Sequence, residues 1–487
     1  MQSRNPAARA HCSTDADAAR LEKLLVDDHD HTESVVPLNE RRGPITMGLL
    51  WITMVTAFPC VLIGFQWYKD GLTFGQVLTC TMIGAAILLL YTIPSSQLGA
   101  TSGQGYGMLS RSVFGRFGSQ LITANLILIF IAWYGLSALF MADGMQGLFH
   151  FTTPLWAVAI GFAFLMACNN FFGFKGVANF ARFFAAPVLI AWVLCTLVKA
   201  VGQFHTTLAL EAPHKSFALA LTTVTSFVIG YGVWGNEADY WRFGKPGTRF
   251  CAIPLTVAVI IGQVIFPTAG WMVARLNHIT ESAAATSFMN DYSFGGIALV
   301  AAIVLAASYF ACNDSNLFGQ VHAWENLKKI PHKKLVACLA VLGAATAAWL
   351  SISGAAKSLE VIASLNCVIV PTPTIIMLAE LLLATKILKT ATNFSTRVTR
   401  LQDTPLVIWP GMIALITGIL VGVATAGVIP GLEFFHFGIC SVQSWLAAVA
   451  VYIPLRLMAH TRSAPAPSDL EHLLADSQPT PEHVLIE

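Results

Sequence analysis

Phe227-Val-Ile-Gly-Tyr-Gly-Val-Trp-Gly-Asn236 lies near the middle of the chain and interrupts a long apolar segment. It holds three glycines within six residues, and glycine weakens a helix because it has the most backbone freedom to lose. They are Gly230, Gly232 and Gly235. A second interruption reads Ala57-Phe-Pro-Cys60, where Pro59 lacks an N–H and frees a carbonyl one turn back. These two breaks decide how the rest of the sequence is interpreted.

The chain around the breaks is strongly apolar. Of its 487 residues, 55 % are hydrophobic and 11 % are charged, whereas soluble domains carry about 45–50 % apolar and about 25 % charged residues. The net charge of +2 gives no basic field for nucleic acid. The apolar residues are gathered in long blocks, which predicts an all-α integral membrane protein with many spans.

Twelve transmembrane helices follow from the rule that about 20 apolar residues are needed to cross the hydrocarbon core. The expected spans are 44–66, 72–98, 118–147, 152–172, 179–202, 216–240, 250–273, 294–324, 334–353, 358–385, 405–428 and 434–458. They divide the chain into a cytoplasmic polar tail (1–43), a first five-helix repeat (44–202), a second five-helix repeat (216–385), helices 11–12 (405–458) and a cytoplasmic tail (459–487).

The Lys and Arg residues predict the orientation. With both termini in the cytoplasm, 23 of the 28 lie on the inner side and five on the outer side. Cytoplasmic loops carry the excess of positive charge in membrane proteins. We therefore expect a multi-pass protein of the cytoplasmic (inner or plasma) membrane with both termini inside.

The two breaks fall in spans one and six, which are corresponding members of two five-helix halves. Such a matched pair of interrupted spans points to an inverted-repeat secondary transporter with a binding site near the membrane midplane. The alternative is that Gly and Pro serve helix packing, for which they are common in membrane helices.

Polar and aromatic residues at mid-depth supply candidates for the site. Span eight holds Asn313 and Asp314, and such residues are costly in the membrane unless they face a cavity or a partner. Trp133 in span three, with Tyr231 and Trp234 near the break of span six, could stack on a flat ring. The alternatives are a helix–helix hydrogen bond for the polar pair and ordinary packing for the aromatic residues.

Motifs of other function classes are not found. The sequence holds no P-loop, nucleophile elbow or HExxH zinc site, which gives no support to an ATP-driven pump or a hydrolase. Its ten cysteines include no CxxC pair, and most lie in or beside apolar spans, where Cys behaves as a small hydrophobe. We expect no enzyme activity, no metal and no cofactor other than a coupling ion.

Short segments in order along the chain resemble the nucleobase–cation symporters, the purine/cytosine/hydantoin permeases, and are most similar to bacterial cytosine permeases. They are Gly99-Ala-Thr-Ser-Gly103, Leu109-Ser-Arg-Ser-Val-Phe-Gly115, Ala132-Trp-Tyr-Gly135, Ala238-Asp-Tyr-Trp-Arg-Phe-Gly244, Asn313-Asp-Ser315, Trp324-Glu-Asn326 and Pro371 to Glu380. The resemblance implies the LeuT-type five-plus-five inverted repeat with two extra helices. It also implies import of cytosine, a purine or a related heterocycle by sodium or proton symport with alternating access.

Several alternatives stay open beside this function. Within the same class, the substrate could be a hydantoin, allantoin or a vitamin-precursor pyrimidine. From another class, the chain could be a transport-like nutrient sensor. We expect a small heterocycle and membrane lipid as partners, no nucleic acid, and a monomer or a weak oligomer.

The resemblance assigns the substrate site residue by residue. Trp133 and Tyr231, which follows Gly230, would sandwich the ring, with Trp234 as the alternative to Tyr231. Asn313 and Asp314 would supply polar contacts from span eight. In cytosine permeases, a Gln one turn before the span-three Trp contacts the edge of the ring. The matching residue in this sequence is Phe130. This departure leaves room for a larger or less polar heterocycle than cytosine.

The resemblance also assigns a sodium site, and the sequence departs from it. The matching positions are Ala57, Cys60, Ser308, Ala311 and Cys312. Hard cations prefer oxygen ligands, and neither Ala311 nor Cys312 has a side-chain oxygen. Our hypothesis is that transport is proton-coupled or weakly sodium-dependent, with Asp314 or Glu237 as the titrating group.

Overall fold

The computed structural model describes residues 34–205, 215–279, 288–289, 291–328, 330–354, 359–389 and 401–463. Residues 1–33 and 464–487 lie outside this part, so most of the two expected tails is not described.

The described chain is helical from end to end, and its only β-type pairing is an isolated bridge between Arg42 and Gly244. The first half forms α2 (Pro44–Val55), α3 (Phe58–Lys69), α4 (Phe74–Ser102), α5 (Tyr106–Phe149), α6 (Leu155–Met166), η1 (Cys168–Phe172), α7 (Gly173–Phe180), η2 (Ala181–Ala185) and α8 (Ala186–Gln203). The second half forms α10 (Phe217–Gly232), α11 (Glu237–Trp241), α12 (Thr248–Val259), η3 (Ile260–Ile265), α13 (Phe266–Asn277), α15 (Ala298–Glu325), α16 (His332–Ser353), α17 (Leu359–Ile369), α18 (Thr372–Leu382) and η5 (Leu383–Leu388). Two last helices follow, α19 (Trp409–Thr425) and α20 (Cys440–Ser463).

The all-helical membrane fold is confirmed, while the number of twelve spans stays a prediction. Nine helical segments of the described chain are long and apolar enough to cross a membrane, or ten when the bent pair α2 and α3 counts as one span. The segment Leu155–Gln203 counts once although two spans were expected there. It contains a 3-10 turn that ends at Gly173, whose φ is +59°. The other difference is α19, which has only 17 residues.

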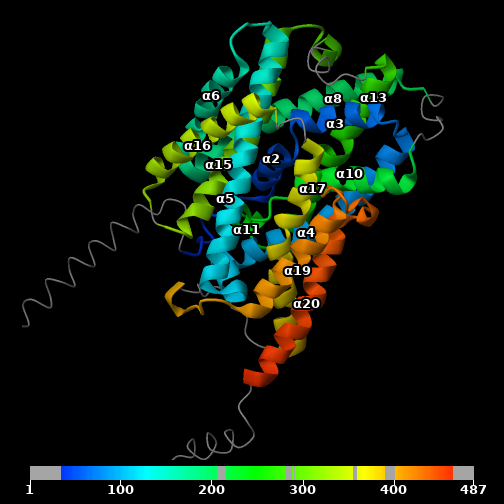
Figure 1. Ribbon diagram of the computed structural model, residues 1–487. Helices are drawn as coiled ribbons and strands as arrows, with labels where there is room; N and C mark the ends of the chain where they lie inside the picture. Colours follow the sequence, from blue (N-terminus) through cyan, green and yellow to red (C-terminus); the bar gives the residue numbers. More distant parts are fainter. Residues whose placement is uncertain are drawn as a thin grey trace, which may run out of the picture.

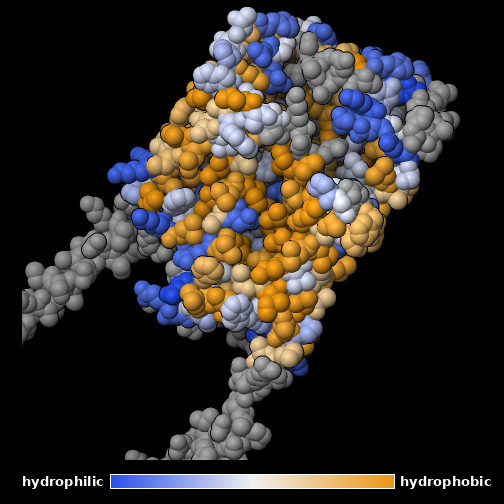
Figure 2. All heavy atoms as spheres, viewed as in Figure 1, coloured by the Kyte–Doolittle hydropathy of each residue, from blue (hydrophilic) through white to orange (hydrophobic). Residues whose placement is uncertain are grey.

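The outer surface is that of a protein in lipid. Large apolar side chains such as Leu128, Val198 and Ile352 are 68 %, 70 % and 75 % exposed. Figure 2 shows apolar side chains over most of the face in view, with polar side chains gathered towards its upper end and along its left edge. Such a band suits the hydrocarbon core, which offers no partner for polar groups.

Packing between helices follows an inverted repeat. The broken span α2–α3 packs against α12 and α13, and the broken span α10–α11 packs against α4. Span one thus contacts span seven as span six contacts span two. Both crossings are close, because a Cβ on Gly64 would lie 2.2 Å from the carbonyl oxygen of Pro267, and a Cβ on Gly99 would lie 2.6 Å from Cα of Ala238. Small residues allow such approaches in membrane proteins.

Figure 1 shows α2 in the interior of the bundle, with α19 and α20 together along one side. These last two helices pack on each other and on α17 and α18, which form span ten.

Candidate functional site

The break of span one is built by two extended residues. α2 ends at Val55, and Thr56 and Ala57 have φ of −131° and −142° before α3 begins at Phe58. The two helices are bent by 45°. The backbone N–H of Phe58 donates to Oγ of Ser308 on α15 at 3.0 Å, so span eight supports the break.

The break of span six is closed by the carboxylate of Glu237. Gly235 has a φ of +78°, and α11 begins at Glu237. One carboxylate oxygen accepts the backbone N–H groups of Trp234 and Gly235 at 3.0 and 3.1 Å. The other accepts the hydroxyls of Tyr91 and Ser95 of α4 at 2.7 and 2.8 Å. Trp234 and Gly235 lie in the break between α10 and α11, so the carboxylate satisfies backbone N–H groups that have no helical partner there.

The two aromatic residues expected to sandwich a ring lie together. Trp133 of α5 and Tyr231 of α10 are 5.6 Å apart between ring centroids and meet edge to face at 86°. Tyr231 also stacks on Phe227 at 5.5 Å and 19°. With Trp133 and Tyr231 in direct contact, a flat ligand could enter between them only after they separate.

The other aromatic candidates form a second pair on the far side of the break. Phe130 and Trp234 are 5.6 Å apart at an angle of 51°, and Trp234 meets Tyr240 edge to face at 5.8 Å. Gly230 serves close packing, because a Cβ there would lie 2.0 Å from the carbonyl oxygen of Ala363 on α17.

The polar candidates of span eight are bound within the protein. Asn313 donates from Nδ2 to the carbonyl oxygen of Tyr134 at 3.1 Å. Asp314 accepts from Nδ2 of Asn169 at 2.8 Å and from Nδ2 of Asn170, both in η1. Consecutive helix positions are about 100° apart, so Asp314 faces η1 while Cys312 faces the opposite side. The structure does not bring Asp314 to the ring pair.

The positions that match the sodium site surround the break of span one. Oγ of Ser308 accepts from the backbone there, and the thiol of Cys60 donates to the carbonyl oxygen of Val55 at 3.8 Å. Among the described residues, no group of three or more His, Cys, Asp or Glu side chains could hold a metal ion. The five matching positions supply two thiols and one side-chain oxygen, that of Ser308, while the hydroxyl of Thr56 and the amide of Gln263 lie at the same break.

Three polar contacts at the breaks were missed by sequence reasoning. Gln263 of η3 donates to the carbonyl oxygen of Val55 at 2.6 Å. Asn366 of α17 donates to the carbonyl oxygen of Gly230 at 2.5 Å, and Thr374 of α18 donates to that of Gly235 at 2.5 Å. A polar side chain inside an apolar span was the available signal, but it does not say which break the side chain reaches.

Relatives of known activity match much of the chain. Cytosine permease of Escherichia coli (strain K12) is 23 % identical over 332 residues, which cover 67 % of this chain and 76 % of the relative. The purine-uracil permease NCS1 of Arabidopsis thaliana is 22 % identical over 316 residues, covering 60 % of this chain and 48 % of the relative.

Solved structures share the fold. Mhp1, described as a nucleobase-cation-symport-1 family transporter in a closed conformation with bromovinylhydantoin bound, aligns with a TM-score of 0.68 and 17 % identity over 90 % of this chain and 98 % of its own. Its inward-facing conformation gives 0.65 and 19 % identity over 88 % of this chain and 94 % of its own. A Na+-coupled sialic acid symporter gives 0.59 and 12 % identity over 89 % and 92 %.

The family whose description reads "permease for cytosine/purines, uracil, thiamine, allantoin" matches residues 36–447. This match covers most of the chain, and the relatives within it are transporters rather than enzymes. The chain belongs to this family of permeases, with the LeuT-type inverted-repeat fold.

Proposed function

We propose that the protein imports a nucleobase-like heterocycle by secondary active transport, with the ring held between Trp133 and Tyr231. The observation that carries this assignment is the meeting of the two side chains at the break of span six, 5.6 Å apart. Stacking of a flat ring on an aromatic face contributes about 0.5–1.5 kcal/mol beyond burial of its area. The alternatives of the same class, a hydantoin, allantoin or a vitamin-precursor pyrimidine, differ from it in the ring alone.

Contact between the two rings also suggests how binding is linked to alternating access. Trp133 belongs to α5 and Tyr231 to α10, which pack against different neighbours: α15 and α16 for α5, and α4 and α17 for α10. We propose that a ligand that separates the rings moves these groups of helices relative to each other. The ligand can shift the equilibrium only as far as it prefers the separated arrangement.

A thermal-shift screen of purified protein against heterocycles, followed by uptake in vesicles, tests the assignment. We expect the Trp133→Ala variant to lose at least tenfold in affinity for the best heterocycle, because the loss of a stacking face and of buried area exceeds about 1.4 kcal/mol. The matched control is Trp349→Ala, since Trp349 of α16 is 61 % exposed on the outer surface.

Unchanged affinity in the Trp133→Ala variant would contradict the sandwich. Binding without net accumulation in vesicles would instead favour a sensor over a transporter.

We infer that the coupling ion is a proton and that Glu237 carries it. The sodium positions Ala311 and Cys312 lack side-chain oxygens, which sodium prefers. Glu237 is fully buried at the break of span six, and no basic side chain of the described residues bonds to its carboxylate. A buried carboxylate without a cationic partner is costly in its charged form. Asp314, also fully buried, is the second candidate.

The orientation and the assembly belong to the same proposal. Both termini would be cytoplasmic, and the protein would act as a monomer in the cytoplasmic membrane. Labelling of cysteines introduced at Lys245 (inner) and Lys69 (outer), both exposed, tests the orientation with an impermeant maleimide on intact cells.

A further inference from the structure

Gln263 is a polar residue in the middle of span seven that the proposed function does not use. It lies in η3, a π-helical turn between α12 and α13, and its side chain is fully buried. A π-turn inside an α-helix holds one extra residue and is frequent at functional sites. A buried amide at this depth needs polar partners.

The partners of this amide belong to the break of span one. Nε2 of Gln263 donates to the carbonyl oxygen of Val55 at 2.6 Å and lies 3.7 Å from Sγ of Cys60. Val55 is the last residue of α2, and its carbonyl has no helical partner because the chain is extended at Thr56 and Ala57. The thiol of Cys60, from α3 of the same span, approaches this carbonyl at 3.8 Å as a weak donor. The amide of Gln263, from another span, therefore supplies its strong donor.

The same turn also reaches the break of span six. A Cβ on Gly232, the last residue of α10, would lie 3.4 Å from Cγ and 3.7 Å from Cδ of Gln263. The preceding Gly262 must stay small, since its Cβ would lie 2.4 Å from the carbonyl oxygen of Val55. The turn therefore fits between the end of α2 and the end of α10, and it touches both broken spans.

Contacts lead from this turn to the ring pair. Cys60, next to the amide of Gln263, lies in the hydrophobic core against which Tyr231 and Trp133 pack, and these two rings meet each other. Oε1 of Gln263 and Oγ1 of Thr56 are buried and have no hydrogen-bond partner in the described part of the chain. An unpaired buried polar atom costs about 1–3 kcal/mol, which a polar ligand group or a water molecule at the break would offset.

We propose that Gln263 is a positioning residue of the substrate site, whose amide N–H holds the Val55 carbonyl and so sets the break of span one against the end of α10. The inference rests on the proposed function for its link to affinity. Its structural part, the hydrogen bond from Gln263 that positions the break of span one, does not depend on any substrate.

Substitutions at this position distinguish a role of Gln263 as a hydrogen-bond donor from a role in filling space. The Gln263→Leu variant keeps the volume but loses the N–H at every pH. The Gln263→Glu variant offers an O–H donor to Val55 only while it is protonated, and its charged form repels the carbonyl oxygen. The control is Asn277→Leu, because Asn277 of α13 donates to Val273 of its own helix.

Equilibrium binding of the best heterocycle to purified protein is the first measurement, with each variant normalised to the unsubstituted protein at pH 5 and pH 8. We expect affinity at least tenfold weaker at both pH values for Gln263→Leu. For Gln263→Glu we expect affinity within threefold at pH 5 and at least tenfold weaker at pH 8. Asn277→Leu should match the unsubstituted protein.

The second measurement needs no substrate. Cys60 is fully buried, and we expect its alkylation by N-ethylmaleimide, followed by mass spectrometry of its peptide, to be at least tenfold faster in Gln263→Leu. An unchanged alkylation rate in this variant overturns the inference, as does unchanged affinity. If the unsubstituted protein binds no heterocycle, the proposed function fails. The alkylation rate then still tests whether Gln263 positions the break of span one.

Discussion

At the scale of single residues, the break of span six depends on one backbone conformation. Gly235 has a φ of +78°, a backbone conformation that residues other than glycine rarely adopt. Its surroundings are equally strict, since a Cβ there would lie 2.2 Å from Cγ1 and 2.7 Å from the carbonyl oxygen of Val370. Because Val370 lies between α17 and α18, the glycine also sets how closely span ten approaches the break.

We expect the Gly235→Ala variant to lower the free energy of unfolding by about 2–4 kcal/mol, from backbone strain and forced separation from Val370. Gly161→Ala is the matched control, because Gly161 lies in α6 with nothing within 4 Å of its added Cβ. There alanine should be neutral or stabilising by up to about 1 kcal/mol. Thermal unfolding of both variants in detergent measures the difference, and an equal Tm would refute the role of Gly235.

Residue identity picked out the aromatic candidates, and the family resemblance chose Tyr231 over Trp234 as the partner of Trp133. Trp133 and Tyr231 could be picked because an aromatic residue at mid-span and one at a break are unusual, and they do meet. The direction of Asp314 could not be predicted, because its partners Asn169 and Asn170 lie in an irregular turn that no periodic pattern marks. Whether any of these residues binds substrate stays a prediction.

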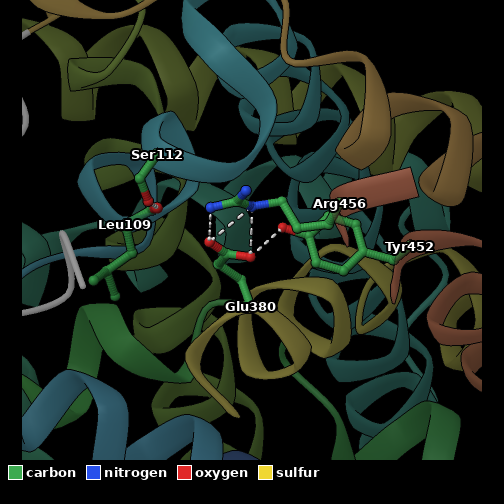
Figure 3. Close-up of polar contacts among 5 residues, drawn as sticks. All are labelled: Leu109, Ser112, Glu380, Tyr452 and Arg456. Carbon is green, nitrogen blue, oxygen red and sulfur yellow. Dashed lines mark hydrogen bonds and ion pairs between the residues drawn. The ribbon is translucent and has the colours of Figure 1, made fainter. Parts of the chain in front are cut away.

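At the scale of elements, α20 is fastened to span ten by charge as well as by packing. Figure 3 shows the carboxylate of Glu380 on α18 between two side chains of α20. Arg456 approaches it with Nη2 at 3.1 Å and Nε at 3.2 Å, and the hydroxyl of Tyr452 donates to it at 2.7 Å. The paired oxygens and nitrogens match the geometry of a bidentate guanidinium–carboxylate pair.

A double-mutant cycle of Glu380→Gln and Arg456→Leu should give a coupling of about 1 kcal/mol in the free energy of unfolding. The value is modest because the two side chains are 14 % and 26 % exposed, and water weakens exposed ion pairs. The cycle of Glu380→Gln with Arg249→Leu, an exposed arginine of α12, is the control and should be additive within about 0.5 kcal/mol. Additivity in the first cycle would show that the ion pair with Arg456 contributes nothing measurable to holding α20.

Elements were predicted well where apolar length decides them and less well where the backbone is irregular. The expected start of span three at 118 falls just after Gly115, where α5 is kinked at a φ of +79°. The backbone N–H groups of Arg116 and Phe117 there bond to the carbonyl oxygens of Pro405 and Leu406, each at 2.8 Å. This pairing joins segments almost 300 residues apart, so no local pattern could have indicated it.

At the scale of the whole molecule, the fold places two fully buried carboxylates where the two repeats meet. Glu237 closes the break of span six against α4, and Asp314 joins span eight to η1. Both are fully buried. In a chain with only 26 acidic residues among 487, a carboxylate kept at this depth without a basic partner is more costly than an amide of the same shape. A role in proton binding would explain why the protein keeps carboxylates at positions where they lower its stability.

Replacing each carboxyl by its amide tests that reason. We expect Glu237→Gln to keep substrate exchange across proteoliposomes but to lose accumulation driven by an inward proton gradient, because the amide oxygen can still accept from Trp234 and Gly235 while no proton is carried. Asp314→Asn should keep both activities if Glu237 alone is the carrier. Uptake that depends steeply on a sodium gradient and does not change with the proton gradient would contradict proton coupling. Loss of accumulation in Asp314→Asn alone would move the proton from the break of span six to the contact between span eight and η1.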